Sequence, residues 1–163
     1  MTRLAGFLGS LLLSIPAVAA AAPCPAGVTE QLDGLYRQSQ PGPVLIASQG
    51  QRFTPGLLAL LSRAYALTPA DGRFVDFDLF SGTQVGTFGA QVLGCTAQPD
   101  GALVARVAVR AGLAGRTTEP PQELRYVMDA PASGGWRIAD IVYPGEPTFR
   151  LTDYLQQLLA PQP

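Results

Sequence analysis

The spacing of apolar residues changes once along the chain, and this change limits the folds that the chain can adopt. Up to about residue 67 the apolar residues recur at intervals of three and four, whereas from Val85 onward they alternate loosely with polar or small residues. The first spacing predicts two amphipathic helices, at 26–40 and 54–67, and the second predicts strands. The predicted strands are 85–95, 103–109, 123–128 and 136–143.

This order of elements predicts an α+β fold. Strands joined by short turns pair antiparallel, and helices that are segregated along the chain cover one face of the sheet. We therefore expect a curved antiparallel sheet of about four strands packed against two N-terminal helices, with a short C-terminal helix at 152–160. The second helix, which begins with a capping Thr54 followed by Pro55, is expected on the concave face of the sheet.

The N-terminus has the three parts of a secretory signal peptide. Arg3 precedes an apolar run at 4–15, and small residues follow Pro16. The run is shorter than the roughly 20 residues that span a bilayer as a helix. We expect a signal peptide over 1–22 and a single mature domain over 23–163, a chain of roughly 140 residues and therefore of ordinary domain size.

The residues around the expected cleavage site leave three good positions for it. Signal peptidase requires small residues one and three positions before the cut, and cuts after Ala19, Ala20 or Ala21 all meet this requirement. A cut just before Pro23 is less favourable because proline distorts the scissile backbone. The residues before Cys24 do not match a lipoprotein signal, so no stable membrane anchor is expected after cleavage.

Two cysteines, Cys24 and Cys95, are expected to form a disulfide bond. Export places both thiols in an oxidising compartment, the periplasm or the outside of the cell, where two cysteines of a small domain usually pair. Two free thiols are the alternative. A zinc site is not expected, because the chain has no histidine and no CxxC spacing.

The charge balance and the missing histidine exclude several functions. Without histidine the chain cannot form a Ser-His-Asp or Cys-His catalytic site. All 11 basic side chains are arginine, and removal of Arg3 leaves 10 basic against 12 acidic residues. A net charge near −2 argues against a nucleic acid or an anionic membrane as the partner. No metal and no other cofactor is expected.

Three carboxylates are the candidate catalytic residues. Asp76 and Asp78, two positions apart on an extended segment, point to one side and can share a proton or bind a hard cation. Asp140 lies four residues after Trp136, so on a regular strand the two side chains share a face, where the acid could act as a general base in a pocket. The alternative is structural: the first two cap backbone amides and pair with arginines such as Arg73, and Asp140 lies at the rim of the sheet.

Four further side chains are candidate binding residues. Tyr36 on the first helix and Tyr126 on a strand could line one cavity, although both are more often core aromatics with a solvated hydroxyl. Trp136 and Arg137 open the strand at 136–143, on which Trp136, Ile138 and Val142 are expected to face the same side.

Three passages together resemble a known bacterial family. They are the leucine-rich helix after Thr54, the segment 74–84 with its alternating aromatic and acidic residues, and the segment 135–143 with the short leucine helix that follows it. Their order is similar to that of small secreted or lipid-anchored proteins in a family of unknown function related to the nuclear transport factor 2-like superfamily. The resemblance implies a cystatin-like roll outside the cytoplasm and carries no established activity. In that family the acidic segment continues into a Gln-Asp pair, whereas here Val85 follows Gln84.

The residues favour a non-catalytic function. We expect a periplasmic or secreted domain that binds a protein or a small molecule through its sheet face or cavity. The alternative is a small enzyme that uses Asp140, or the pair of Asp76 and Asp78, as a carboxylate base.

Overall fold

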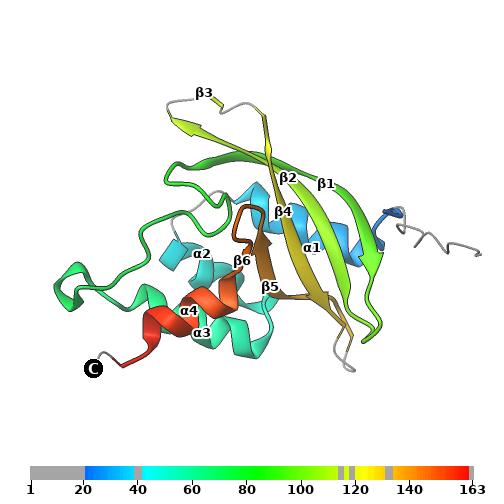
Figure 1. The fold of residues 1–163 in the computed structure, drawn as a ribbon. Helices are drawn as coiled ribbons and strands as arrows, with labels where there is room; N and C mark the ends of the chain where they lie inside the picture. The colour runs from blue at the N-terminus through cyan, green and yellow to red at the C-terminus, as the bar shows by residue number, and fades with distance from the viewer. Residues whose placement is uncertain (1–20, 39–41, 114–115, 118–119, 131–133, 162–163) are drawn as a thin grey trace, which may run out of the picture.

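The computed structural model describes residues 21–38, 42–113, 116–117, 120–130 and 134–161, which form an α+β fold (Figure 1). Three helices precede the sheet and one follows it. They are α1 (Ala26–Arg37), α2 (Gly42–Gln49), α3 (Pro55–Tyr65) and α4 (Leu151–Leu159), with single 3-10 turns at Gly50–Arg52 and Pro69–Asp71.

The sheet is curved and antiparallel throughout. Its strands are β1 (Thr87–Ala97), β2 (Leu103–Leu113), β3 (Arg116–Thr117), β4 (Gln122–Asp129), β5 (Arg137–Tyr143) and β6 (Phe149–Arg150). Five of them follow one another in the order β1-β2-β4-β5-β6, and β3 pairs with the end of β2. The expected number of about four strands is therefore too low. The additional strands β3 and β6 have two residues each, too few to show alternation, and form by pairing with the ends of β2 and β5.

The helix α3 begins at its predicted cap, whereas α1 ends at Arg37, before the expected end at residue 40, and one helix is additional. The hydroxyl of Thr54 accepts a hydrogen bond from the Leu57 amide at 3.4 Å, and Pro55 occupies the first position of α3. The additional helix is α2, whose apolar residues at 44–47 are too few to show a helical period.

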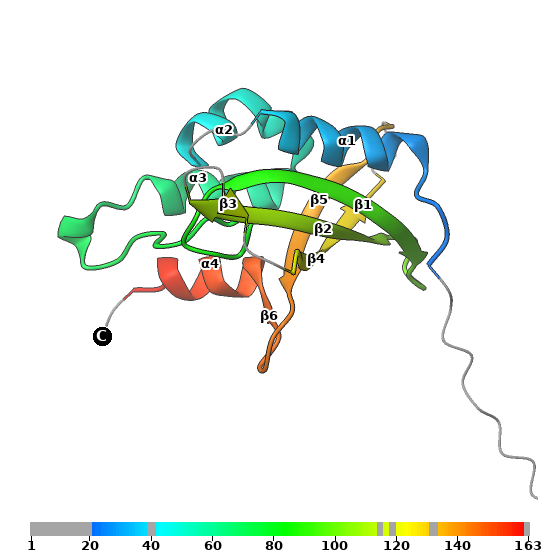
Figure 2. The same ribbon diagram turned by 90° about the horizontal axis from the view of Figure 1, so that it is seen from above.

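The helices pack on one face of the sheet, which we call the core face (Figure 2). α1 runs alongside β1, whereas α3 packs between α2 and α4 and reaches the sheet at β5. The Thr54 amide donates to the carbonyl oxygen of Ile138 at 2.9 Å and so ties the start of α3 to β5. The largest fully buried side chains are Phe53, Leu32, Leu35, Leu57, Leu61, Leu79, Leu124, Met128, Ile138, Ile141, Tyr126 and Tyr143.

A one-residue bulge in β5 changes which of its side chains face the core. Ile138 lies opposite Met128, but Asp140 lies opposite the adjacent Val127, so β5 has one residue more than β4 over this interval. The alternation is shifted beyond the bulge, and Ile141 is fully buried while Val142 faces away from the core. The expectation that Val142 and Asp140 share a face with Trp136 and Ile138 is therefore wrong.

The predicted bond between Cys24 and Cys95 is present, with 4.8 Å between the two Cα atoms. Next to it, Ala22 forms an antiparallel bridge with Cys95 on the outer edge of β1. Elsewhere β1 is an edge strand, and its pairing with β2 is interrupted by register shifts at Thr87/Gly89 and Val92/Gly94. The disulfide is compatible with an oxidising, secreted setting.

Candidate functional site

The face of the sheet opposite the core, which we call the open face, carries a hollow of about 600 Å³. Helix α1 lies behind the sheet in Figure 1, so that view looks toward this face. The volume lies within the range of about 300–1,000 Å³ found for small-molecule sites. The lining residues come from all five consecutive strands, from the connection between β1 and β2, and from the segment before α1: Ala21, Thr96, Gln98, Asp100, Ala102, Val104, Arg106, Arg125, Val127, Val142 and Arg150.

Strand pairing brings three arginines into one row across the hollow. Arg106 on β2 lies directly opposite Arg125 on β4, which lies opposite Val142 on β5, which in turn lies opposite Arg150 on β6. Directly paired positions share a face and place their Cβ atoms about 5 Å apart, so like charges there repel each other. This arrangement concentrates positive charge on the middle of the open face.

A carboxylate compensates the first of these arginines. Arg106 donates from Nε and Nη2 to the two carboxylate oxygens of Glu123, at 2.9 and 2.7 Å. The hydrogen bonds from Arg106 hold the pKa of Glu123 below its ordinary value, and the nearby charge of Arg125 acts in the same direction. Both partners remain substantially solvent-exposed, so the pair contributes little to stability.

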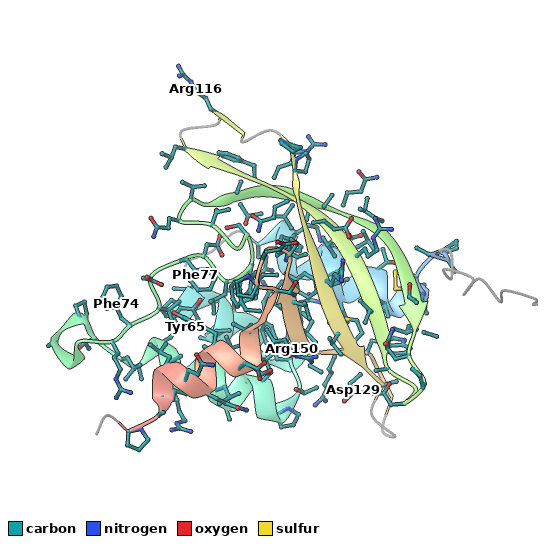
Figure 3. All side chains as sticks on the ribbon, viewed as in Figure 1. Tyr65, Phe74, Phe77, Arg116, Asp129 and Arg150 are labelled. Atoms are coloured by element: carbon teal, nitrogen blue, oxygen red, sulfur yellow. A yellow bond between two sulfur atoms is a disulfide. The ribbon has the colours of Figure 1, made fainter. Side chains whose placement is uncertain are left out.

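The third arginine is held from one side. Arg150, labelled in Figure 3, donates from Nε to the Asp140 carboxylate at 2.7 Å, and its side chain is 51% exposed. Its two terminal nitrogens have no protein acceptor among the described residues. They are therefore available to an anion in the hollow.

Arg125 has no ion-pair partner in the part of the chain that the structure describes. It lies between the other two arginines, and its side chain is exposed. A guanidinium offers five N–H donors in a fixed plane that matches a carboxylate or a phosphate. This makes Arg125 the natural centre of an anion site.

The floor beside the arginines is apolar. Val104 and Val127 are directly paired in the neighbouring row, and Val142 lies beside Arg125. A ligand that fits both surfaces has a negatively charged group and an apolar part. Asp100 also lines the hollow and disfavours a second negative charge at that end.

Asp140, one of the predicted catalytic residues, is buried and engaged in four hydrogen bonds. One carboxylate oxygen accepts from the amides of Ile141 and Thr152 at 2.9 and 3.0 Å, and the other accepts from Arg150 Nε and the Thr152 hydroxyl at 2.7 and 2.8 Å. An ionised carboxylate has about four lone-pair positions, so no lone pair is left for a substrate proton. Asp140 fastens the start of α4 to β5.

Asp76 and Asp78 lie in an irregular segment rather than on a strand, and their surroundings differ. Asp78 accepts from the Phe80 amide at 2.9 Å and from the Thr87 hydroxyl at 3.2 Å, as a turn-forming aspartate does. Asp76 is exposed and meets the Tyr154 hydroxyl at 3.5 Å. A pocket of about 30 Å³ beside Asp78 has room for only about one or two water molecules.

Tyr36 and Tyr126 do meet, at the margin of the core, where Tyr126 is fully buried and Tyr36 is partly exposed beside a pocket of about 30 Å³. Their hydroxyl oxygens are 2.5 Å apart, and Tyr36 also donates to the Phe80 carbonyl at 2.8 Å. Tyr143 donates to the Leu79 carbonyl at 2.7 Å. Burial raises the pKa of all three tyrosines, because a tyrosinate would lose its hydration there.

Trp136 and Arg137 lie away from the hollow. Trp136 is half-buried and packs on the core, with its ring against Gly27 of α1, where an added Cβ would come within 3.2 Å of the indole. Arg137 is paired in register with Asp129, which is labelled at the end of β4 in Figure 3. Neither residue is brought together with Asp140 or with the two tyrosines.

The residues that line the hollow are largely ones that the sequence alone does not single out. Alternation does place Arg106 and Arg110 on the solvated face of their strand. The register that aligns Arg106 with Arg125 and Arg150 depends on bulges and on a two-residue strand, and neither feature has a clear sequence signature.

Among the described residues, no group of three or more His, Cys, Asp or Glu side chains could hold a metal ion. No helix in the described ranges is long and apolar enough to cross a membrane. Comparison of the chain with family models, curated proteins and solved structures finds no match. A function therefore has to be inferred from the chain's own residues.

Proposed function

We propose that the chain is a non-catalytic binding domain of the periplasm or the extracellular space, and that it holds an anionic ligand with an apolar part on the open face of its sheet. The observation that carries this proposal is Arg125, an exposed guanidinium in direct register with Arg106 above a floor of valines. Two opposed arginines cost stability in the free protein. An anion between them removes this cost.

The charges and the apolar residues of the hollow limit the chemical class of the ligand. Glu123 and Asp140 compensate Arg106 and part of Arg150, so the uncompensated positive charge is centred on Arg125. One carboxylate or one phosphate matches this charge better than a polyanion does. The valine floor adds affinity for an alkyl or aromatic group in proportion to the apolar area that it covers.

The proposal includes a cystatin-like roll as the scaffold. The curved antiparallel sheet with helices on one face supports it. The carboxylate-base alternative has less support, because Asp140 is fully engaged in hydrogen bonds and Asp78 borders a pocket of only about 30 Å³.

The test uses three small probes on the oxidised, processed protein. Octanoate carries both features of the proposed ligand, octan-1-ol carries only the chain, and acetate carries only the charge. We expect octanoate to shift the amide signals of β2, β4 and β5 in NMR spectra at concentrations where neither of the other two does. Equal shifts with octanol would show that the arginines take no part.

The matched variants are Arg125→Gln and Arg110→Gln. Both replace an exposed arginine on the open face, but Arg110 lies outside the lining of the hollow. Arg125→Gln should weaken octanoate binding at least tenfold, and Arg110→Gln should change it less than twofold. Similar effects of the two substitutions would mean that octanoate binds by nonspecific charge attraction, and this would refute the proposed site.

A further inference from the structure

The hollow on the open face carries opposite charges at its two ends. At one end is the arginine row, formed by Arg106, Arg125 and Arg150. At the other end is Asp100, in the turn between β1 and β2. One carboxylate oxygen of Asp100 accepts from the Ala102 amide at 3.1 Å, and the side chain has no ion-pair partner among the described residues. Its second oxygen is therefore available to a ligand.

The distance between the two ends follows from the geometry of β2. Ala102, which lines the hollow beside Asp100, lies four residues before Arg106 in the run that forms this strand. A strand advances about 3.3 Å per residue, so about 13 Å separate these two positions. An extended peptide has the same rise, so a chain of about four residues covers this distance.

The lining between the two ends suits a peptide better than an alkyl chain. Val104 and Val127 form an apolar floor, and Thr96 is paired with Val104 in the same row. One row further along, the Gln98 amide donates to the Ala102 carbonyl at 2.8 Å, and the Gln98 side chain also lines the hollow. The hydroxyl and the side-chain amide offer donors and acceptors to peptide groups. Alternate side chains of an extended peptide would cover the valines.

We propose that the ligand of the open face is a short peptide with two free ends, bound with its carboxylate at Arg125 and its amino group at Asp100. A guanidinium binds a carboxylate through two parallel hydrogen bonds, and an ammonium group donates to a carboxylate. The opposite direction would place like charges together at both ends. This inference rests on the proposed function, because it takes the anion site at Arg125 as given and adds the class and direction of the ligand.

The test compares three forms of one tetrapeptide, Ala-Val-Ala-Val, on the oxidised, processed protein, with octanoate as the reference. The free peptide has both charges, the N-acetylated form keeps only the carboxylate, and the C-terminal amide keeps only the amino group. The acetylated form also represents the C-terminal tail of a longer protein, which has no terminal amino group at this distance. Affinities are measured by NMR titration of the amide signals of β2 and β4.

We expect the free peptide to bind most tightly. Acetylation should weaken binding about threefold, which is the size of effect that a solvent-exposed ion pair produces. Amidation should weaken binding at least tenfold, because it removes the charged hydrogen bonds to Arg125. If the acetylated form binds as well as the free peptide, the amino group takes no part and the inference is wrong.

The matched variants are Asp100→Asn and Asp129→Asn. Asparagine at position 100 keeps an oxygen that can accept from the Ala102 amide, so the turn is retained. Asp129, labelled in Figure 3, is an exposed acid two residues after Val127 on the same face of β4, outside the lining of the hollow. Asp100→Asn should abolish the difference between the free and acetylated peptides and change octanoate binding less than twofold. Asp129→Asn should leave that difference in place.

The outcomes separate this inference from the proposed function. If octanoate binds and Arg125→Gln weakens it, but Asp100→Asn leaves the difference between the free and acetylated peptides unchanged, the anion site stands and the peptide assignment is overturned. An equal loss of that difference in Asp129→Asn would likewise overturn it, because the effect would then be one of net charge. If neither octanoate nor the free peptide binds, the anion site itself is wrong and this inference fails with it.

Discussion

Removal of the disulfide should lower the stability of the domain by an amount that follows from the loop it closes. Cys24 and Cys95 are 71 residues apart in sequence. In the chain-entropy model, closing a loop of this length contributes about 4 kcal/mol at 25 °C. A domain of roughly 140 residues unfolds with an entropy of about 0.3 kcal/mol/K near its midpoint, so this loss corresponds to a Tm decrease of about 15 °C.

The assay is urea and thermal unfolding of the oxidised protein, of the protein in excess reductant, and of Cys24→Ala, Cys95→Ala and the double variant. Either single substitution already breaks the bond, so each should cost nearly as much as the double variant. Reduction leaves both sulfur atoms in place and separates the loss of the bond from the loss of side-chain packing. Amides in the first turn of α1 should also exchange faster, because Cys24 lies just before that helix.

Two results would contradict this reasoning. One is a change in the free energy of unfolding below about 1 kcal/mol on reduction, which would mean that the loop is already constrained in the unfolded chain. The other is additive effects of the two single substitutions, which would mean that each acts through its own packing and not through a shared bond.

Three further changes have predictable outcomes. Because burial raises the pKa of Tyr36, Tyr126 and Tyr143 above the ordinary value of about 10, the stability that depends on their neutral form is complete below about pH 10 and is lost as the pH rises above it. The share of the tyrosinate absorbance at 295 nm that these three contribute should therefore appear together with unfolding seen by circular dichroism, and titration of all five tyrosines before any unfolding would contradict this. Asp140→Asn should destabilise the domain by about 2–4 kcal/mol in urea unfolding, because the amide cannot accept all four hydrogen bonds, whereas a control change at an exposed position costs about 0.5 kcal/mol or less. Glu123→Gln should change the free energy of unfolding by less than about 1 kcal/mol, and it should strengthen octanoate binding because Arg106 loses its carboxylate partner. Weaker binding in a calorimetric titration would count against the proposed anion site.

The sequence predicts the class of fold because each long element has its own period. The leucines of α3 and the alternation in β4 are regular enough to identify a helix and a strand. Thr54 followed by Pro55 likewise identifies the start of α3. β6 and α2 could not be identified in this way, since both are too short for a period and depend on contacts with elements distant in sequence.

The candidate site was harder to predict for a related reason. A side chain's face follows from its position in a strand only while the alternation continues, and the bulge before Asp140 interrupts it. The sequence identifies Asp140 as an acid near a tryptophan, but its hydrogen bonds to Arg150 and Thr152 depend on how α4 returns to the sheet. The pairing of Cys24 with Cys95 needed no such geometry, since two cysteines have only one intramolecular partner each.

The irregular outer edge of β1 has a consequence for how the protein behaves at high concentration. A long, straight edge strand invites pairing between molecules and thereby aggregation. Here the register shifts at Thr87/Gly89 and Val92/Gly94 divide the 11-residue strand, and Ala22 occupies part of the edge that remains. Molecules crowded together at high concentration would find no long, regular stretch of this edge on which to assemble.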